Sequence, residues 1–301
     1  MSLDKQDYDY VVIGSGFGGS VSALRLSEKG YRVLVIEKGK WWNSKDFAKT
    51  NWNLKRWMWL PALRFWGILK LTYYRHIGIL SGVGVGGGSL VYANTLPIPK
   101  PSFFTAQSWS HLVDWEDELK EFYSLALKML GANKNPRMET GDIALKEVAG
   151  DMNKEKDFHA TNVAVYFGEP GETVSDPYFE GKGPNRTGCI FCGACMVGCR
   201  HNAKNTLDKN YLYLAQQNGA EIQAESRVVD VKPKGDENGS DGYEVLWEKS
   251  TSILFKKRKR VFCKGVIFSG GVLGTVQLLL SLKGSSLPHL SDKVGCRVRT
   301  N

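Results

Sequence analysis

The fold of this chain is decided near its N-terminus, by the stretch Tyr8-Asp-Tyr-Val-Val-Ile-Gly-Ser-Gly-Phe-Gly-Gly19. Its first part, up to Ile13, is apolar and β-branched, which predicts a buried strand ending at Gly14. Residues 19–29 have the apolar spacing of a helix. A second buried strand is predicted for residues 31–37 and ends in the acidic Glu37. A strand, glycine turn, helix, strand and acid within about 30 residues are typical of a dinucleotide-binding unit.

Glycine at this first loop, residues 14–19, meets two physical needs. The turn must be tight, and the backbone must approach a pyrophosphate closely. The helix that follows presents free N–H groups and the positive end of its dipole to the phosphates. Glu37 is placed to accept hydrogen bonds from the ribose hydroxyls of the adenosine, and the alternative is a surface acid before a turn.

A second glycine-rich loop lies at residues 82–94 and reads Gly-Val-Gly-Val-Gly-Gly-Gly-Ser-Leu-Val-Tyr-Ala-Asn. Two backbone cradles indicate a large cofactor that is held along its length. This favours a flavin over a nicotinamide, because an NAD-dependent dehydrogenase would leave the second loop without a role.

Composition and charge narrow the class of protein. The chain has 301 residues, 42% of them hydrophobic and 24% charged, with a net charge of +9. These values are those of an ordinary globular protein, and we find no apolar run near the ~20 residues that span a bilayer.

The densest basic run, Lys256-Lys-Arg-Lys-Arg260, is predicted to be a solvated edge between strands, with a nuclear address or nucleic-acid patch as the alternative. We expect no nucleic-acid partner and, without a visible secretory signal, a cytoplasmic location.

The segment 41–77 is rich in aromatic residues. It contains Trp41, Trp42, Trp52, Trp57, Trp59 and Trp66, with Arg and Lys interleaved. Three interpretations stay open. The segment is a lid over the cofactor or over a bulky apolar substrate, a peripheral contact with a membrane surface, or plain core packing of a long connection.

Further elements follow from periodicity. Helices are predicted at 112–130, 140–153, 206–217 and 272–282, and loops or short strands at 168–188. Strands are predicted at 220–224, 227–232, 243–248, 251–255, 261–263 and 264–269. The strand that ends at residue 269 runs into Gly270 and Gly271, a third glycine turn before a helix.

The chain resembles the glucose–methanol–choline (GMC) family of FAD-dependent oxidoreductases and, within it, a cholesterol-oxidase-like branch. Four stretches carry the match in order: the first loop with Glu37; residues 82–91; residues 203–212 with the strand 227–231; and residues 267–279. The resemblance implies an α/β, Rossmann-like three-layer domain that binds FAD, with an inserted and incomplete substrate (cap) region. The implied FAD-binding domain is discontinuous, at 4–40, 78–110 and 186–301, with 111–185 as part of the cap.

By this resemblance, the second loop lies against the pyrophosphate and the flavin side of FAD, and strand 227–231 presents backbone groups to the adenine. The implied cofactor-binding residues are Gly14, Gly16, Phe17, Gly18, Gly19, Glu37, Lys38, Gly84, Gly86, Gly87, Gly88, Ser89, Asn94, Val228, Val229, Gly270 and Gly271. In one place the chain departs from the family pattern. Relatives often carry Asn or His where Tyr92 stands, and Asn94 lies two residues further on the same strand face.

The family's catalytic pair, a histidine with His or Asn, has no match here. The histidines of the chain are His76, His111, His159, His201 and His289, and none has the right context. We therefore expect the catalytic part to lie beyond residue 301 and the catalytic residues of this chain to be unknown.

Four cysteines, Cys189, Cys192, Cys195 and Cys199, have the C-x2-C-x2-C-x3-C spacing of a bacterial ferredoxin. The proline that usually follows the last cysteine is replaced by Arg200. An iron–sulfur cluster, a zinc site, disulfides and reduced packed cysteines all remain possible interpretations.

The sequence thus predicts FAD-dependent oxidation of a CH–OH group by hydride transfer to flavin N5, on a sterol or another bulky apolar alcohol, with O2 or a carrier as acceptor. One alternative is a dehydrogenase that passes electrons through an iron–sulfur cluster to a carrier. Another is a flavin-binding fragment without turnover.

Overall fold

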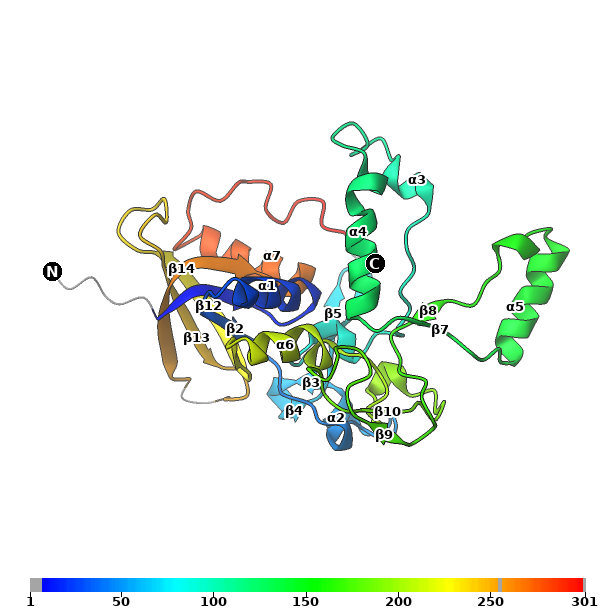
Figure 1. Ribbon diagram of the computed structural model, residues 1–301. Helices are drawn as coiled ribbons and strands as arrows, with labels where there is room; N and C mark the ends of the chain where they lie inside the picture. The colour runs from blue at the N-terminus through cyan, green and yellow to red at the C-terminus, as the bar shows by residue number, and fades with distance from the viewer. Residues whose placement is uncertain (1–6, 254–255, 300–301) are drawn as a thin grey trace.

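The computed structural model of this chain describes residues 7–253 and 256–299. Its main sheet has the strand order β11-β2-β1-β14-β13-β12. Figure 1 shows β12, β13 and β14 of this sheet at the left of the molecule. Four strands pair in parallel: β11 (Glu221–Gln223), β2 (Val33–Ile36), β1 (Tyr8–Ile13) and β14 (Arg258–Phe268). Two more continue the sheet in antiparallel pairing: β13 (Tyr243–Lys249) and β12 (Ser226–Pro233).

Helices cover both faces of this sheet. Because side chains alternate along a strand, Val12 and Val35 belong to one buried cluster, whereas Val11 and Ile36 belong to another. The first cluster holds α1 (Phe17–Glu28) and α6 (Tyr211–Gln217), and the second holds Leu282 of α7 (Gly271–Lys283). The prediction of an α/β, Rossmann-like domain in three layers is confirmed.

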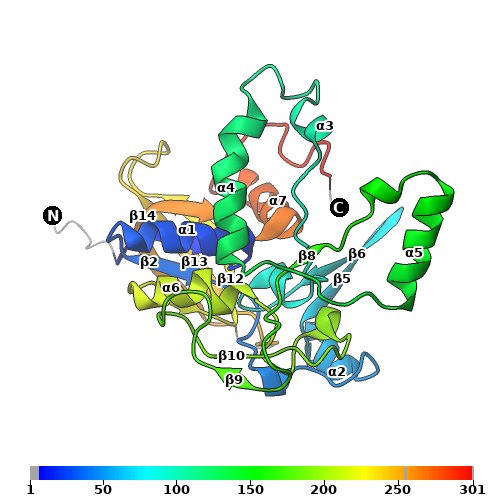
Figure 2. The same ribbon diagram turned by 45° about the vertical axis from the view of Figure 1, so that its right-hand side comes forward.

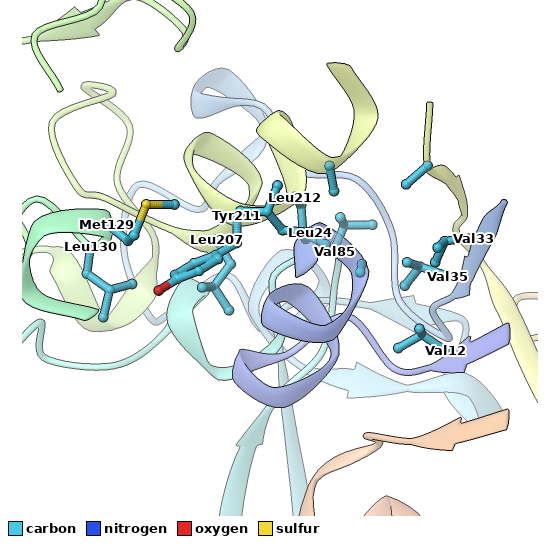
Figure 3. Close-up of a cluster of buried hydrophobic side chains, with 13 residues drawn as sticks. Val12, Leu24, Val33, Val35, Val85, Met129, Leu130, Leu207, Tyr211 and Leu212 are labelled. Atoms are coloured by element: carbon cyan, nitrogen blue, oxygen red, sulfur yellow. The ribbon is translucent and has the colours of Figure 1, made fainter. Parts of the chain in front are cut away.

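The first cluster also anchors the second glycine loop. Val85, in the middle of that loop, is fully buried beside Leu24 of α1 and Leu212 of α6 (Figure 3). A fully buried Val side chain contributes about 1.5–3 kcal/mol relative to an exposed one. The loop is therefore part of the hydrophobic core.

The rest of the chain forms short elements around this domain. Residues 41–82 contain η1 (Ser44–Asp46), α2 (Leu54–Trp57), β3 (Trp59–Leu60), η2 (Pro61–Leu63), β4 (Phe65–Trp66), β5 (Leu69–Tyr74) and β6 (Ile77–Gly82). Further along lie η3 (Gly87–Leu90), α3 (Pro101–Phe104), α4 (Trp115–Met129), β7 (Asn133–Lys134), α5 (Thr140–Asp151), η4 (Glu155–Asp157), β8 (Asn162–Val163), β9 (Thr173–Val174), β10 (Arg186–Thr187), η5 (Cys195–Val197) and η6 (Leu207–Lys209). The β5–β6 hairpin and α5 project from the body of the molecule (Figure 2).

Three predicted strands are corrected. The strands expected at 261–263 and 264–269 are one strand, β14, because its first part pairs with β13 and its second part pairs with β1. The strand expected at 251–255 does not form over residues 251–253, which turn instead, and residues 254–255 lie outside the described ranges. The basic run at 256–260 is exposed as expected, yet its last three residues lie within β14.

Two helix starts also differ from the prediction, each because of a capping side chain. Helix α4 begins at Trp115 because the Asp114 carboxylate accepts hydrogen bonds from the N–H groups of Glu116 and Asp117. The helix expected at 206–217 is split into η6 and α6, and Asn210 caps the second part.

Candidate functional site

The three glycine-rich segments meet at the carboxyl ends of β1 and β14. Gly14 has φ +100°, and a Cβ added there would lie 2.5 Å from the Ser269 carbonyl oxygen and 2.8 Å from Gly270 Cα. A Cβ on Gly87 would lie 2.7 Å from Gly16 Cα. These approaches are possible only without side chains. The carboxyl ends of parallel strands are where open α/β sheets bind ligands.

Two glycines in this region are not explained by packing within the protein. A Cβ on Gly16 or Gly88 would meet no protein atom within 4 Å. Gly16 has φ −71°, which any residue adopts, so its conformation does not require glycine either. Both positions face open space next to the N-terminus of α1. A cradle that a Cβ would fill fits a ligand whose phosphates lie against the main chain, as a dinucleotide would.

Ser15 joins the first loop to the second. Its side chain is fully buried, and its Oγ donates to Glu37 Oε2 at 2.8 Å. The same oxygen accepts a hydrogen bond from the Gly86 N–H at 3.1 Å. The role of Ser15 was not predicted from the sequence, although its place between two loop glycines was a signal.

Glu37 follows β2 directly and points at the first loop. Glu37 is 6% exposed; its Oε2 accepts from the Ser15 N–H at 3.1 Å, and its Oε1 accepts from the Gly39 N–H at 2.8 Å. A carboxylate has about four acceptor positions, so capacity remains for a ligand hydroxyl. The ribose contact stays a prediction. Lys38, next in the chain, has its pKa lowered by burial, which the Glu37 charge partly opposes.

Ser89 and Trp42 also hold the second loop in place. Ser89 Oγ donates to the Gly86 carbonyl at 2.7 Å and accepts from the Leu207 N–H at 3.0 Å. Trp42 packs against Gly84, where an added Cβ would lie 2.8 Å from the indole ring. The loop is thus fixed on three sides, by Ser15, by the segment before α6 and by the aromatic segment.

Tyr92 and Asn94 have different surroundings. The Tyr92 hydroxyl donates to the Asn205 carbonyl at 3.2 Å, its ring meets Phe17 edge-on at 5.8 Å, and burial raises its pKa. Asn94 is 3% exposed, has φ 69°, and its Oδ1 has no hydrogen-bond partner in the described structure. A buried amide oxygen without a partner costs about 1–3 kcal/mol, so it fits a site that a ligand N–H completes.

Strand β12 begins beside Glu37. The Ser226 N–H donates to the Glu37 carbonyl at 2.8 Å. The pairing register with β13 shifts between Val228 and Asp230, so Val229 lies in a bulge, and Val228 packs in the core. A bulged residue leaves backbone groups outside the ladder. This suits the predicted backbone contact of Val229 with an adenine, which remains a prediction.

The four cysteines do not form the metal site that their spacing suggested. Over residues 7–253 and 256–299, no group of three or more His, Cys, Asp or Glu could hold a metal ion, and the cysteines are free thiols. The sulfurs of Cys189 and Cys199 accept backbone N–H groups at 3.4 Å and pack on Val163, Val165 and Ala203, whereas Cys192 is exposed. The spacing of a ferredoxin run is thus present without a metal-binding group in the described part of the chain.

Two buried cations lie at segment 202–205 and were not predicted from the sequence. Arg186 and Lys204 are each 1% exposed. Arg186 donates to the Asn205 side chain and to the Ala203 carbonyl, whereas Lys204 Nζ donates to the carbonyls of Leu90, Tyr92 and Cys195. Burial lowers the pKa of both groups, that of Lys204 to about 7. Lys and Arg are usually exposed, which is why their sequence positions gave no signal.

The histidines lie elsewhere. His201 is half-buried, and His76, His111, His159 and His289 are exposed. His289 contacts Glu237 at 2.6 Å on the surface.

The aromatic segment has two kinds of tryptophan. Trp42 and Trp57 pack with Phe47, Ile68 and Leu90 beneath the second loop. Trp41 and Trp52 are exposed, Trp52 to 90%. Core packing therefore accounts for part of this segment. No helix in the described ranges is long and apolar enough to cross a membrane.

Comparison with known families matches two parts of the chain. Residues 12–41 match the NAD(P)-binding Rossmann-like domain, and residues 181–299 match the GMC oxidoreductase family. The first match covers the first glycine loop and Glu37, and the second covers the cysteines, β12 and the third glycine turn.

Several curated proteins are similar over nearly the whole chain. A cholesterol oxidase from Acinetobacter baumannii is 48% identical and aligns with 100% of this chain and 55% of its own length. A cholesterol oxidase from Mycobacterium tuberculosis is 47% identical, over 99% of this chain and 52% of its own length. A long-chain-alcohol oxidase from Arabidopsis thaliana is 28% identical over 88% of this chain and 30% of its own length. The chain thus spans about half the length of the two cholesterol oxidases.

Solved structures show the same fold at low identity. A pyridoxine 4-oxidase from Mesorbium loti has a TM-score of 0.55 at 19% identity and covers 90% of this chain and 51% of its own. A fungal aryl-alcohol oxidase has a TM-score of 0.52 at 17% identity, with 91% and 47% covered.

Proposed function

This chain belongs to the GMC oxidoreductase family, and from that premise we propose that it forms the FAD-binding part of an enzyme that oxidises alcohols. The observation that carries this proposal is the joined pair of glycine loops, with Ser15 bonded to Gly86 and with Gly16 and Gly88 facing open space. Two backbone cradles side by side suit a cofactor with a pyrophosphate and a second large ring system. The proposed FAD-binding ranges are 4–40, 78–110 and 186–301.

The residues of this chain would hold FAD along its length. The N–H groups at the start of α1 would bind the pyrophosphate, and Glu37 would accept the ribose hydroxyls. The unpartnered Asn94 Oδ1 would accept an N–H from the flavin end. When bound, the flavin would accept a hydride from the carbon of an alcohol.

The proposed substrate is a sterol or another bulky apolar alcohol. Support comes from the cholesterol oxidases that are 47–48% identical over nearly all of this chain. The proposed acceptor is O2, since these relatives are named oxidases. No residue of the chain is assigned to the proton transfer that alcohol oxidation also needs.

Reconstitution with FAD tests the proposal in two steps. The purified chain should bind FAD stoichiometrically, seen as flavin absorbance that stays with the protein after gel filtration. Because no residue of this chain is assigned to the proton transfer, anaerobic cholesterol in detergent should bleach the flavin band only slowly, yet faster than ethanol does, and air should restore the band with release of hydrogen peroxide. A colourless protein would overturn the cofactor assignment. A yellow protein that no alcohol bleaches would indicate flavin binding without turnover.

We also propose that the tip of the β5–β6 hairpin contacts a lipid surface. Tyr73 and Ile77 are 76% and 51% exposed and flank the basic Arg75 and His76. Aromatic, apolar and basic side chains together suit the membrane boundary.

Sedimentation with vesicles of phosphatidylcholine and phosphatidylserine tests this contact. The double variant Tyr73→Ser and Ile77→Ser should lose vesicle binding. The matched control, Leu145→Ser with Val148→Ser, removes residues of α5 that are 60% and 49% exposed and should bind as the wild type does. Equal binding by both variants would contradict the proposal.

A further inference from the structure

Lys204 is a buried cation beneath the second glycine loop. Its Nζ donates to the carbonyls of Leu90, Tyr92 and Cys195, at 3.1, 2.8 and 2.9 Å. Three carbonyl acceptors match the three N–H donors of an ammonium group. The charge is thus held by dipoles, and Asp208, the acid nearby, is paired with Lys209 at 2.9 Å.

Lys204 contacts the C-terminal end of the second glycine loop. Leu90 is the last residue of η3, and Tyr92 is two residues beyond it. The ammonium also lies 4.7 Å from the centre of the Tyr92 ring. Three residues after Lys204, the Leu207 N–H donates a hydrogen bond to Ser89 Oγ. Segment 204–207 therefore fixes the end of the loop at several points.

Resting on the FAD site proposed above, we infer that Lys204 is a positioning residue for the flavin. It fixes the C-terminal end of the second glycine loop, and it supplies a positive charge that favours a negatively charged flavin ring. A charge in the protein interior acts over longer distances than one in water, because the effective dielectric constant is lower. Charge near the flavin is one of the means by which a protein tunes its electronics. Below its pKa of about 7, Lys204 is a charge of this kind, carried by the segment that holds the loop.

Arg186 offers a matched control. It is buried to the same extent as Lys204 and donates to the residues on either side of it, at the Ala203 carbonyl and the Asn205 side chain. Its hydrogen bonds go to residues 202–205, whereas those of Lys204 reach the second loop. Loss of either cation perturbs the same segment, but only the loss of Lys204 removes a charge bonded to the loop.

The experiment compares the FAD-loaded chain with its Lys204→Met and Arg186→Met variants at pH 6. Sulfite is the probe, since it adds to oxidised flavin and leaves a negative charge on the ring. Lys204→Met should weaken sulfite binding by about tenfold, as expected for a lost charge in a low-dielectric site. It should also lower the flavin midpoint potential. Arg186→Met, which removes a cation that is not bonded to the loop, should change the sulfite affinity and the potential less than Lys204→Met does.

Lys204→Gln and Lys204→Arg serve if the Met variant does not fold. The neutral Gln variant should behave as Met would, and the Arg variant should restore sulfite affinity. If the wild type binds FAD and the neutral variants keep its sulfite affinity and potential, the inference is overturned and the proposed function stands. If the wild type retains no FAD, both are overturned.

Discussion

The Gly86 N–H donates to Ser15 Oγ at 3.1 Å, across 71 residues of sequence. The same hydroxyl donates to Glu37 Oε2 at 2.8 Å. One buried side chain therefore connects both glycine loops and the acid that follows β2.

Ser15→Ala should weaken FAD binding by about tenfold. The substitution leaves the buried Gly86 N–H and one Glu37 oxygen short of a partner, at a cost of about 1–3 kcal/mol. Titration with FAD, followed by flavin fluorescence, measures the change. Ser22→Ala is the control, since the Ser22 hydroxyl bonds only within α1, to the Gly18 carbonyl. Equal losses in both variants would argue against the connecting role.

Gly16→Ala should abolish FAD binding and leave the apoprotein folded. An alanine at Gly16 meets no protein atom, so the free energy of unfolding should stay within about 1 kcal/mol of the wild type or rise. Gly19→Ala should instead unfold or strongly destabilise the protein, because its Cβ would lie 2.0 Å from the Gly14 carbonyl oxygen. Urea unfolding and FAD titration of both variants separate the two effects. If Gly16→Ala bound FAD as tightly as the wild type does, Gly16 would not be part of the phosphate-binding site.

Asn94→Gly should lower FAD affinity without destabilising the apoprotein. Glycine keeps the positive φ of 69°, and the lost amide oxygen has no partner within the described residues. Asn153→Gly is the matched control, because Asn153 has φ 55° and is exposed. Thermal unfolding with and without FAD measures both quantities. A ligand-induced rise in Tm that is equal in the two variants would exclude Asn94 from the site.

The Cys263 thiol should lower the free energy of unfolding as pH rises above about 9, relative to a Cys263→Ala variant. Cys263 is fully buried, and burial raises the pKa of its thiol from 9.0 to about 12. Between these values the unfolded chain releases a proton that the folded chain retains, so stability present below pH 9 is lost at up to about 1.4 kcal/mol per pH unit. Urea unfolding at pH 8 to 10.5 measures the slope. Lys204, whose pKa is lowered to about 7, contributes a slope of opposite sign in every variant, so the thiol is measured by the difference in slope between the wild type and Cys263→Ala. Cys296→Ala, which removes an exposed thiol, should keep the wild-type slope.

The fold was predictable because local pattern and tertiary structure agree in β1, α1 and β2. The apolar run before Gly14 and the glycines after it determine strand, turn and helix almost residue by residue. The extent of β14 was not predictable, because it depends on pairing with β13 and β1, which are distant in sequence. The break before α6 depends on the unusual backbone of Asn210, with φ −138° and ψ −96°.

The candidate site was predictable where glycine marks it. The loops at 14–19 and 84–88 and the turn at 270–271 do converge. What escaped prediction is what holds them, since Ser15 and Lys204 act through contacts with residues far along the chain. The cysteine spacing left a metal site and packed thiols both open, because spacing along the sequence does not by itself determine the positions of the sulfurs.

Val85 shares its packing cluster with α1 and α6. The position of the second loop therefore depends on core packing as well as on any ligand that it binds. The same arrangement makes assays of this protein easy to misread. A substitution deep in that cluster, far from any phosphate, would reduce flavin content, and a survey scored by colour alone would count packing defects as lost ligand contacts.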